Sequence, residues 1–316
     1  MIIGILGFGS IGKRHAKNLI GLKKKVLIFD TNKKKKNEIE RMGCKFISDK
    51  KDFVKSIDVG IIATPSQYHL HDIVLLINNH KDCFVEKPLS HEIIETKKIL
   101  DYAKKKKIIV FVGQNLRFHP AVKKAKQWID NKIIGKVLWS RLICSSYLPD
   151  WRKNYDFKKN YANNKKAGGV IFDCIHEIDL ANYLMGKTSF VNSVIRKSGL
   201  LDLDVEDFAD INLRHKDGHI SSIHLDYLTK PKFRLTQVAG EKGVIEIDIS
   251  NRKIKLINNT GKIIKKNSYS KDFNIDYKNE IKSFLDNVKK RSRPICDGYE
   301  GLEVLRQAIQ AKNDAA

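Results

Sequence analysis

The first residues of the chain contain a glycine pattern that restricts the possible folds more than any other stretch. The apolar run Ile2–Leu6 leads directly into Gly7, Gly9 and Gly12, which have the spacing Gly-x-Gly-x-x-Gly. Helix-forming residues follow, so the glycines stand in the strand–turn–helix context of a dinucleotide-binding loop. Gly7 would permit the tight turn, Gly9 would let a pyrophosphate approach the backbone, and Gly12 would let the helix pack against the strand. The expected contacts with the cofactor are Gly7, Phe8, Gly9, Ser10, Ile11 and Gly12.

An acidic residue at the end of the next apolar run supports this interpretation. Lys25–Phe29 has the composition of a second strand and is followed by Asp30. That position is close to the offset of roughly 20 residues at which a carboxylate binds the adenosine ribose hydroxyls. A carboxylate there would repel a 2′-phosphate, so the sequence favours NAD over NADP, although Lys33 could soften the preference.

The composition limits the class of protein. A length of 316 residues suits two domains, since domains have roughly 100–200 residues. No apolar run approaches the roughly 18 residues that span a bilayer, and no basic leader precedes the first strand, so we expect a cytoplasmic protein with no membrane partner. The five cysteines are scattered without a Cys-x-x-Cys pair, which argues against a metal site and a disulfide framework.

The formal net charge of +24 raises the question of nucleic-acid binding. The lysines recur along the whole chain, mostly where helix ends and loops are expected, and no aromatic-studded basic strand accompanies them. We therefore interpret the charge as a lysine-rich surface and expect no nucleic-acid partner. Such a surface would still steer an anionic substrate.

Strand-like and helix-like segments alternate up to about residue 119, which predicts a parallel, doubly wound sheet. Beyond residue 120 most apolar runs are β-like and joined by turns, which predicts a largely antiparallel sheet. A predicted helix over 168–184 interrupts it, and 277–290 and 299–313 are helical again. The fold class is therefore α/β, with a Rossmann dinucleotide-binding domain over 1–119 and an α+β domain with a large open sheet over 120–316.

Several short motifs stand at the ends of the predicted strands and at the start of the predicted helices. They are Gly7-x-Gly9-x-x-Gly12, Ala63-Thr64-Pro65, Glu86-Lys87-Pro88, Asn115-x-Arg117-Phe118-x-Pro120, and Gly168-Gly169 leading to His176-x-x-Asp179. With these motifs the chain resembles the Gfo/Idh/MocA oxidoreductase family. The resemblance implies an NAD(P)-dependent dehydrogenase or reductase that acts on a sugar, sugar acid, cyclitol, nucleotide sugar or related polyol. It also implies an open C-terminal sheet whose exposed face makes a homodimer or homotetramer.

The resemblance also implies the catalytic residues. Lys87 would contact the cofactor ribose and the substrate hydroxyl, and His176 would be the base because imidazole titrates near neutral pH. On one helix, Asp173 and Asp179 would share a face with His176, and Asp173 would orient the imidazole or bind a substrate hydroxyl. The aspartate stands three residues before the histidine, whereas the best-known relatives place it four before.

Further contacts follow from the segments at the carboxyl ends of the predicted strands. Arg117 would bind a substrate carboxylate or hold the domain interface, and both alternatives stay open. The polar, aromatic segment 148–166 would contribute substrate contacts. The additional cofactor residues are Ala63, Thr64, Pro65, His69, Glu86, Lys87 and Asn115, and the substrate residues are Lys87, Arg117, Trp151, Arg152, Asp173 and His176.

Reaction direction is also open: the alternatives to an alcohol dehydrogenase are a reductase of an imine or ketone and a non-catalytic regulator.

Overall fold

The computed structural model describes residues 1–151, 157–159, 161–165 and 167–313, and the chain divides into two units. The first unit comprises Met1–Gln114 and Asn274–Leu305, and the second comprises Asn115–Phe273 and Arg306–Ala316. This partition differs from the division at residue 119 that the sequence suggested, because 274–305 packs with the N-terminal part. Among the described residues, none of the helices has the length and apolar character needed to cross a membrane.

The first unit is built on a six-stranded sheet in the order β3-β2-β1-β4-β5-β6, with all pairs parallel. This confirms the doubly wound parallel sheet. The strand order reverses direction between β1 and β4, so their carboxyl ends border the crevice in which such sheets bind ligands. The strands are β1 Ile2–Leu6, β2 Lys25–Phe29, β3 Lys45–Phe46, β4 Val59–Ile62, β5 Asp82–Val85 and β6 Val110–Val112.

Helices cover this sheet because each has an apolar stripe along one side. Helix α9, Asn274–Lys290, joins the first unit through Phe284, whose ring contacts Phe84 of β5 and Phe111 of β6 at centroid distances of 5.8 and 5.9 Å. The other helices are α1 Ser10–Gly21, α2 Lys36–Arg41, α3 Lys50–Lys55, α4 His69–Asn78 and α5 Ile93–Lys105, with 3-10 turns η1 Lys33–Lys35 and η2 Ser66–Tyr68.

The second unit contains an eight-stranded sheet in the order β14-β13-β12-β11-β7-β10-β9-β8. Only β7 and β10 pair in parallel, so the predicted, mostly antiparallel sheet is confirmed. The sequence analysis did not predict β13 and β14. The strands are β7 Val137–Ser145, β8 Thr188–Arg196, β9 Phe208–His215, β10 Ile220–Asp226, β11 Phe233–Gly240, β12 Gly243–Asp248, β13 Lys253–Asn258 and β14 Ile263–Ser268.

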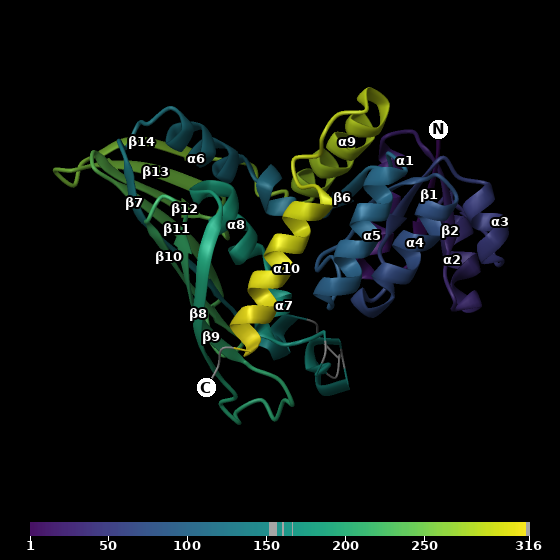
Figure 1. Ribbon diagram of the computed structural model, residues 1–316, viewed down its shortest axis with the longest axis horizontal. Helices are drawn as coiled ribbons and strands as arrows, with labels where there is room; N and C mark the ends of the chain where they lie inside the picture. Colours follow the sequence, from purple (N-terminus) through teal and green to yellow (C-terminus); the bar gives the residue numbers. More distant parts are fainter. Residues whose placement is uncertain (152–156, 160, 166, 314–316) are drawn as a thin grey trace. The chain divides into compact units, whose positions relative to one another are not determined.

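Helices α6, α7 and α8 pack on the strands of this sheet, and they can be followed in Figure 1. The single helix predicted over 168–184 is wrong. The structure has a short α7, Val170–Asp173, and a separate α8, His176–Met185, and Cys174 and Ile175 interrupt the helix between them. The remaining elements are α6 Pro120–Asp130, α10 Gly298–Asn313, η3 Asn115–Phe118, η4 Leu148–Trp151, η5 Phe157–Lys159 and η6 Tyr161–Asn163.

Candidate active site

The glycine loop between β1 and α1 has the geometry that the sequence predicted. Gly7 has φ of 91°, and a Cβ there would lie 2.7 Å from the Ala63 carbonyl oxygen. A Cβ on Gly12 would lie 2.0 Å from the Gly7 carbonyl oxygen, so the helix packs closely only because that residue is glycine. A Cβ on Gly9 would meet no atom within 4 Å, which leaves the space above the loop open for a ligand.

The start of α1 is suited to an anion. Its N-cap residue is Gly9, which supplies no side-chain hydrogen bond, and the first turn contains no acidic residue. The first backbone N–H groups of a helix lack partners within it and carry the positive end of the helix dipole. The loop and helix therefore offer the uncapped, side-chain-free surface that the pyrophosphate of a dinucleotide requires.

Asp30 follows β2 and is held by three donors. The Phe8 N–H donates to Oδ2 at 2.6 Å, the Asn32 N–H donates to Oδ1 at 2.8 Å, and the Lys35 ammonium lies 2.9 Å from Oδ2. Burial raises the pKa of the Asp30 carboxyl, but the bonds from Lys35 and the two amides outweigh it and hold the pKa below its ordinary value. The group is a carboxylate at neutral pH, and the adjacent cation is Lys35, where the sequence analysis suggested Lys33.

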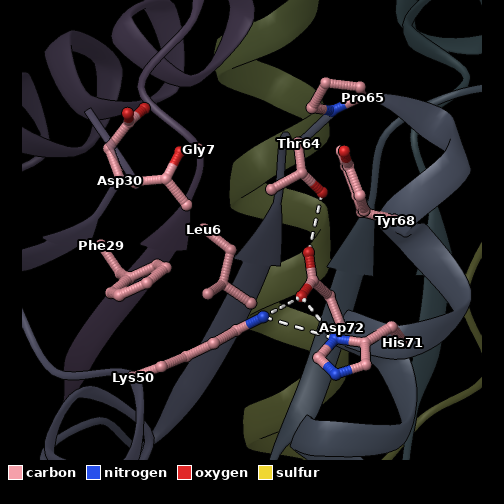
Figure 2. A pocket seen from close by; sticks show the side chains of 11 residues that line it. Leu6, Gly7, Phe29, Asp30, Lys50, Thr64, Pro65, Tyr68, His71 and Asp72 are labelled. Atoms are coloured by element: carbon pink, nitrogen blue, oxygen red, sulfur yellow. Dashed lines mark hydrogen bonds and ion pairs between the residues drawn. The ribbon is translucent and has the colours of Figure 1, made fainter.

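A cavity of about 540 Å³ lies beside Asp30, between the carboxyl ends of β1, β2 and β4. Figure 2 shows the Lys50 ammonium and the Thr64 hydroxyl directed at Asp72, with Asp30 beside Gly7 on the other side of the cavity. Thr64 donates to Asp72 at 2.8 Å, and Lys50 bonds to it at 2.6 Å. The lining residues are Leu6, Gly7, Phe29, Asp30, Thr31, Lys50, Thr64, Pro65, Tyr68, His71 and Asp72.

The segment after β5 is tied to the glycine helix. His15, fully buried in α1, has Nε2 2.6 Å from Glu86 Oε1. Glu86 is itself 9% exposed, and its Oε2 faces the Lys87 N–H at 3.3 Å. The peptide bond between Lys87 and Pro88 is cis. The carboxylate of Glu86 thus links the pyrophosphate helix to the backbone of Lys87.

His69 joins two of the loops at the edge of the sheet. Its Nδ1 lies 2.9 Å from the Pro88 carbonyl oxygen and its Nε2 2.9 Å from that of Thr64. Burial lowers the pKa of His69 although both carbonyl contacts oppose this, so the ring is uncharged at neutral pH and donates only one of the two bonds. The ring braces the loops that follow β4 and β5. A direct contact between His69 and the cofactor stays a prediction.

In the second unit, Asp173 is placed by a residue that the sequence analysis missed. Tyr227, fully buried just after β10, donates its hydroxyl to Asp173 Oδ2 at 2.6 Å. The edge of its ring meets Trp151 at a centroid distance of 5.4 Å. Because the helix is interrupted before His176, the helical spacing that put Asp173 and His176 on one face does not apply. His176 is the first residue of α8 and is 9% exposed.

The neighbouring acidic residues of α8 form ion pairs. Asp179 pairs with Arg117 of η3 through Nη2–Oδ1 and Nε–Oδ2 distances of 2.7 and 2.9 Å, and both side chains are buried. Glu177 pairs with Arg234 of β11 through the guanidinium Nε and Nη2, which donate one to each carboxylate oxygen. This partner gives Arg117 a packing role within the second unit, whereas its contact with a substrate carboxylate stays a prediction. Asp179 lies three residues after His176 on α8, whereas Asp173 belongs to the separate helix α7.

Three further residues were predicted to contact the substrate or the cofactor. Trp151 is 40% exposed and donates its indole N–H to Ser146 Oγ at 2.9 Å, so one side of the ring is open to solvent. Arg152 lies outside the described residues. Asn115 begins η3 and is buried, and its role toward the cofactor stays a prediction.

Comparison with models of known protein families identifies the family of this chain. Residues 1–114 match the model described as "Oxidoreductase family, NAD-binding Rossmann fold", and residues 122–246 match the "GFO/IDH/MocA C-terminal domain". The chain is a member of the Gfo/Idh/MocA oxidoreductase family. Its first unit is an NAD-binding Rossmann domain, and the protein is an NAD-dependent oxidoreductase.

Individual relatives match either nearly the whole chain or a part of it. Myo-inositol 2-dehydrogenase of Thermotoga maritima is 27% identical over 99% of this chain and 95% of its own length. Scyllo-inositol 2-dehydrogenase (NAD(+)) of Bacillus subtilis is 33% identical over 58% of this chain and 53% of its own. Levoglucosan dehydrogenase in complex with NADH and levoglucosan has the same fold, with a TM-score of 0.90, 20% identity and coverage of 100% and 97%.

The glycine loop and Asp30 of this family member fit the cofactor. The uncapped α1 start would hold the pyrophosphate, Asp30 would accept from the ribose hydroxyls, and the cavity beside it would hold the adenosine half. The sequence analysis missed Lys50, Tyr68 and Asp72, which line that cavity, and Lys35, which contacts Asp30. No motif identifies them, because only the pairing of β1 with β2 and β4 brings their segments together.

Proposed function

We propose that this enzyme transfers a hydride between NAD and a secondary alcohol carbon of a sugar, cyclitol or related polyol. The observation that carries the proposal is the Glu86-Lys87-Pro88 segment, which is held at the carboxyl end of β5 by the buried contact of Glu86 with His15. Relatives support the substrate class, since they are named for myo-inositol, scyllo-inositol and UDP-N-acetylglucosamine. All three names denote ring compounds that carry several secondary hydroxyls.

The chemistry needs a base for the hydroxyl proton and a donor to the alcohol oxygen. NAD, when bound, supplies the hydride acceptor. We propose that His176 takes the hydroxyl proton and that Lys87 donates a hydrogen bond to the same oxygen. Asp173 would bind a neighbouring hydroxyl or orient His176, with its carboxylate held by Tyr227.

A panel of polyols tests the reaction. The enzyme would be incubated with NAD and myo-inositol, scyllo-inositol, levoglucosan, glucose 6-phosphate or UDP-N-acetylglucosamine, and the absorbance of NADH would be followed. The expected result is turnover with at least one of these compounds. Binding of NADH without turnover of any compound in either direction would instead support a non-catalytic regulator.

Two variants test the catalytic roles. Lys87→Met and His176→Gln should each lower kcat by roughly 100-fold or more, within the range expected for lost acid–base catalysis. His176→Gln should leave NADH binding within about threefold, because His176 is not among the predicted cofactor contacts. His176→Gln should also remove one ionisation from the pH–rate profile. A His176 variant that keeps the full profile would contradict the assignment of the base.

We also propose that the open face of the large sheet makes a homodimer or homotetramer. Trp139 of β7 pairs with Ile220 of β10, and the row continues through Arg214 to Phe190 of β8, so these apolar side chains share one face. Trp139, Phe190 and Ile220 are each more than two-fifths exposed. Exposed apolar surface of this kind marks interaction sites.

Light scattering coupled to size-exclusion chromatography tests the assembly. Ile220→Lys should shift the mass toward the monomer, whereas the control Leu200→Lys should not, because Leu200 is exposed but lies outside the strands. A monomeric wild-type enzyme would contradict this proposal without affecting the proposed reaction. The cytoplasmic location expected from the sequence belongs to the same set of proposals, and cell fractionation would test it.

A further inference from the structure

The carboxylate expected to bind the adenosine ribose already has three hydrogen-bond donors. Asp30 accepts from the amides of Phe8 and Asn32 and from the Lys35 ammonium, and it is only 9% exposed. A carboxylate has about four lone-pair sites. One acceptor position remains for a ribose hydroxyl, and the negative charge that would exclude a 2′-phosphate is paired with a cation.

The chain next to Asp30 carries further positive charge. Lys33, Lys34 and Lys35 form η1, and Lys36 begins α2 directly after it. The first acidic residue beyond this run, Glu38, is paired with Lys13. The surroundings of Asp30 therefore contain an excess of cations over anions.

We propose that Lys35 is a second cofactor-specificity residue, which gives this site a usable affinity for NADP in addition to NAD. A ribose hydroxyl that donates to Asp30 would lie within hydrogen-bond distance of the carboxylate. The Lys35 ammonium lies 2.9 Å from Oδ2 of the same carboxylate. A phosphate on that hydroxyl would thus come within reach of the ammonium. The flexible lysine stem allows the ammonium to turn from the carboxylate to the phosphate.

The inference rests on the NAD-binding role of the first unit and does not depend on the substrate. A phosphomonoester carries close to two negative charges at neutral pH. When Lys35 moves to the phosphate it keeps one charge-assisted bond in place of another. NAD binding, in contrast, needs Lys35 only to hold the carboxylate.

Fluorescence titrations with NADH and NADPH test the proposal without any substrate. The wild-type enzyme should bind both, with dissociation constants within about 30-fold of each other, or about 2 kcal/mol. Lys35→Met should weaken NADPH binding by roughly 10- to 100-fold, the effect of losing one hydrogen bond to a charged group, and should change NADH binding by less than about threefold. The control Lys34→Met, next to it in η1, should change neither by more than about threefold.

The variant Lys35→Arg keeps the cation and should retain NADPH binding, which separates loss of charge from damage to the fold. The proposal is overturned if the wild-type enzyme shows no saturable NADPH binding, or if Lys35→Met weakens both nucleotides equally. Equal weakening would mean that Lys35 only orders the Asp30 loop. An enzyme that binds both nucleotides but oxidises no polyol would support this inference and contradict the proposed reaction.

Discussion

The buried ion pair between Arg117 and Asp179 should contribute strongly to the stability of the second unit. The two groups meet through hydrogen bonds of 2.7, 2.9 and 3.2 Å, and their side chains are 5% and 1% exposed. The guanidinium also lies over the ring of Tyr183, 5.1 Å from its centroid. Asp179→Leu keeps a side chain of similar size but leaves the arginine cation without this carboxylate.

The expected cost can be worked out from the geometry. Unit charges about 4 Å apart interact by about 4 kcal/mol at an effective dielectric constant of 20. Removing one member of a buried pair typically costs roughly 3–5 kcal/mol, because the remaining charge stays buried. We expect Asp179→Leu and Arg117→Met each to lower the free energy of unfolding by that amount. The double variant should recover at least half of the summed loss, since a paired apolar replacement leaves no uncompensated charge.

Urea unfolding followed by tryptophan fluorescence measures this effect in the correct unit. All three tryptophans, Trp128, Trp139 and Trp151, lie in the second unit. In thermal unfolding, the loss should lower Tm by roughly 10 °C, at about 2–4 °C for each kcal/mol in a unit of this size. A loss below about 1 kcal/mol for Asp179→Leu, or a double variant with the summed loss of both singles, would refute the reasoning.

Three further predictions concern the cofactor loop, the large sheet and the candidate site. Gly12→Ala should weaken NADH binding by more than about tenfold, because its Cβ would lie 2.0 Å from the Gly7 carbonyl oxygen. The control Gly21→Ala should bind NADH normally, because its Cβ meets nothing within 4 Å. Equal NADH binding by the two variants would contradict the packing argument. The hydrogen bonds from His224 to Asp226 and Asp210, opposed by burial, raise the pKa of His224 above its ordinary 6.5, so its contribution to stability is present below about pH 6.5 and is lost as the pH rises through the folded-state value. Denaturant midpoints measured across this range should show that loss, and His224→Gln should flatten it; an unchanged profile would exclude His224 as the source. Tyr227→Phe removes the hydroxyl that bonds to Asp173 but keeps the ring against Trp151, so kcat should fall roughly 10-fold or more while NADH binding and Tm stay near wild type. Unchanged turnover would show that Asp173 does not need this bond.

Local patterns were sufficient to predict most of the first unit. The strands Ile2–Leu6 and Lys25–Phe29 were predicted with the observed bounds. Both have strong apolar character, and the glycine spacing before α1 has a steric meaning at each position. Such elements are predictable because their signal lies within a few consecutive residues.

Of the two strands that the sequence analysis missed, β13 does alternate, with Ile254 and Leu256 buried, whereas β14 lacks such a signal. β14 is exposed along its whole length and includes Lys265 and Lys266, so it shows no alternation of buried and exposed residues. It forms a strand because β13 offers it a pairing edge. The interruption at Cys174 and Ile175 was also hidden, because the residues on both sides have the composition of one helix.

The sequence by itself determined the cofactor class, the family and the fold class, since each rests on short motifs or on the order of strands and helices. The tertiary structure alone decided the partners of the charged and polar side chains. Glu86 meets His15 across 71 residues, and Tyr227 meets Asp173 across 54. Contacts of this kind depend on which strands become neighbours, and no local pattern of residues encodes that choice.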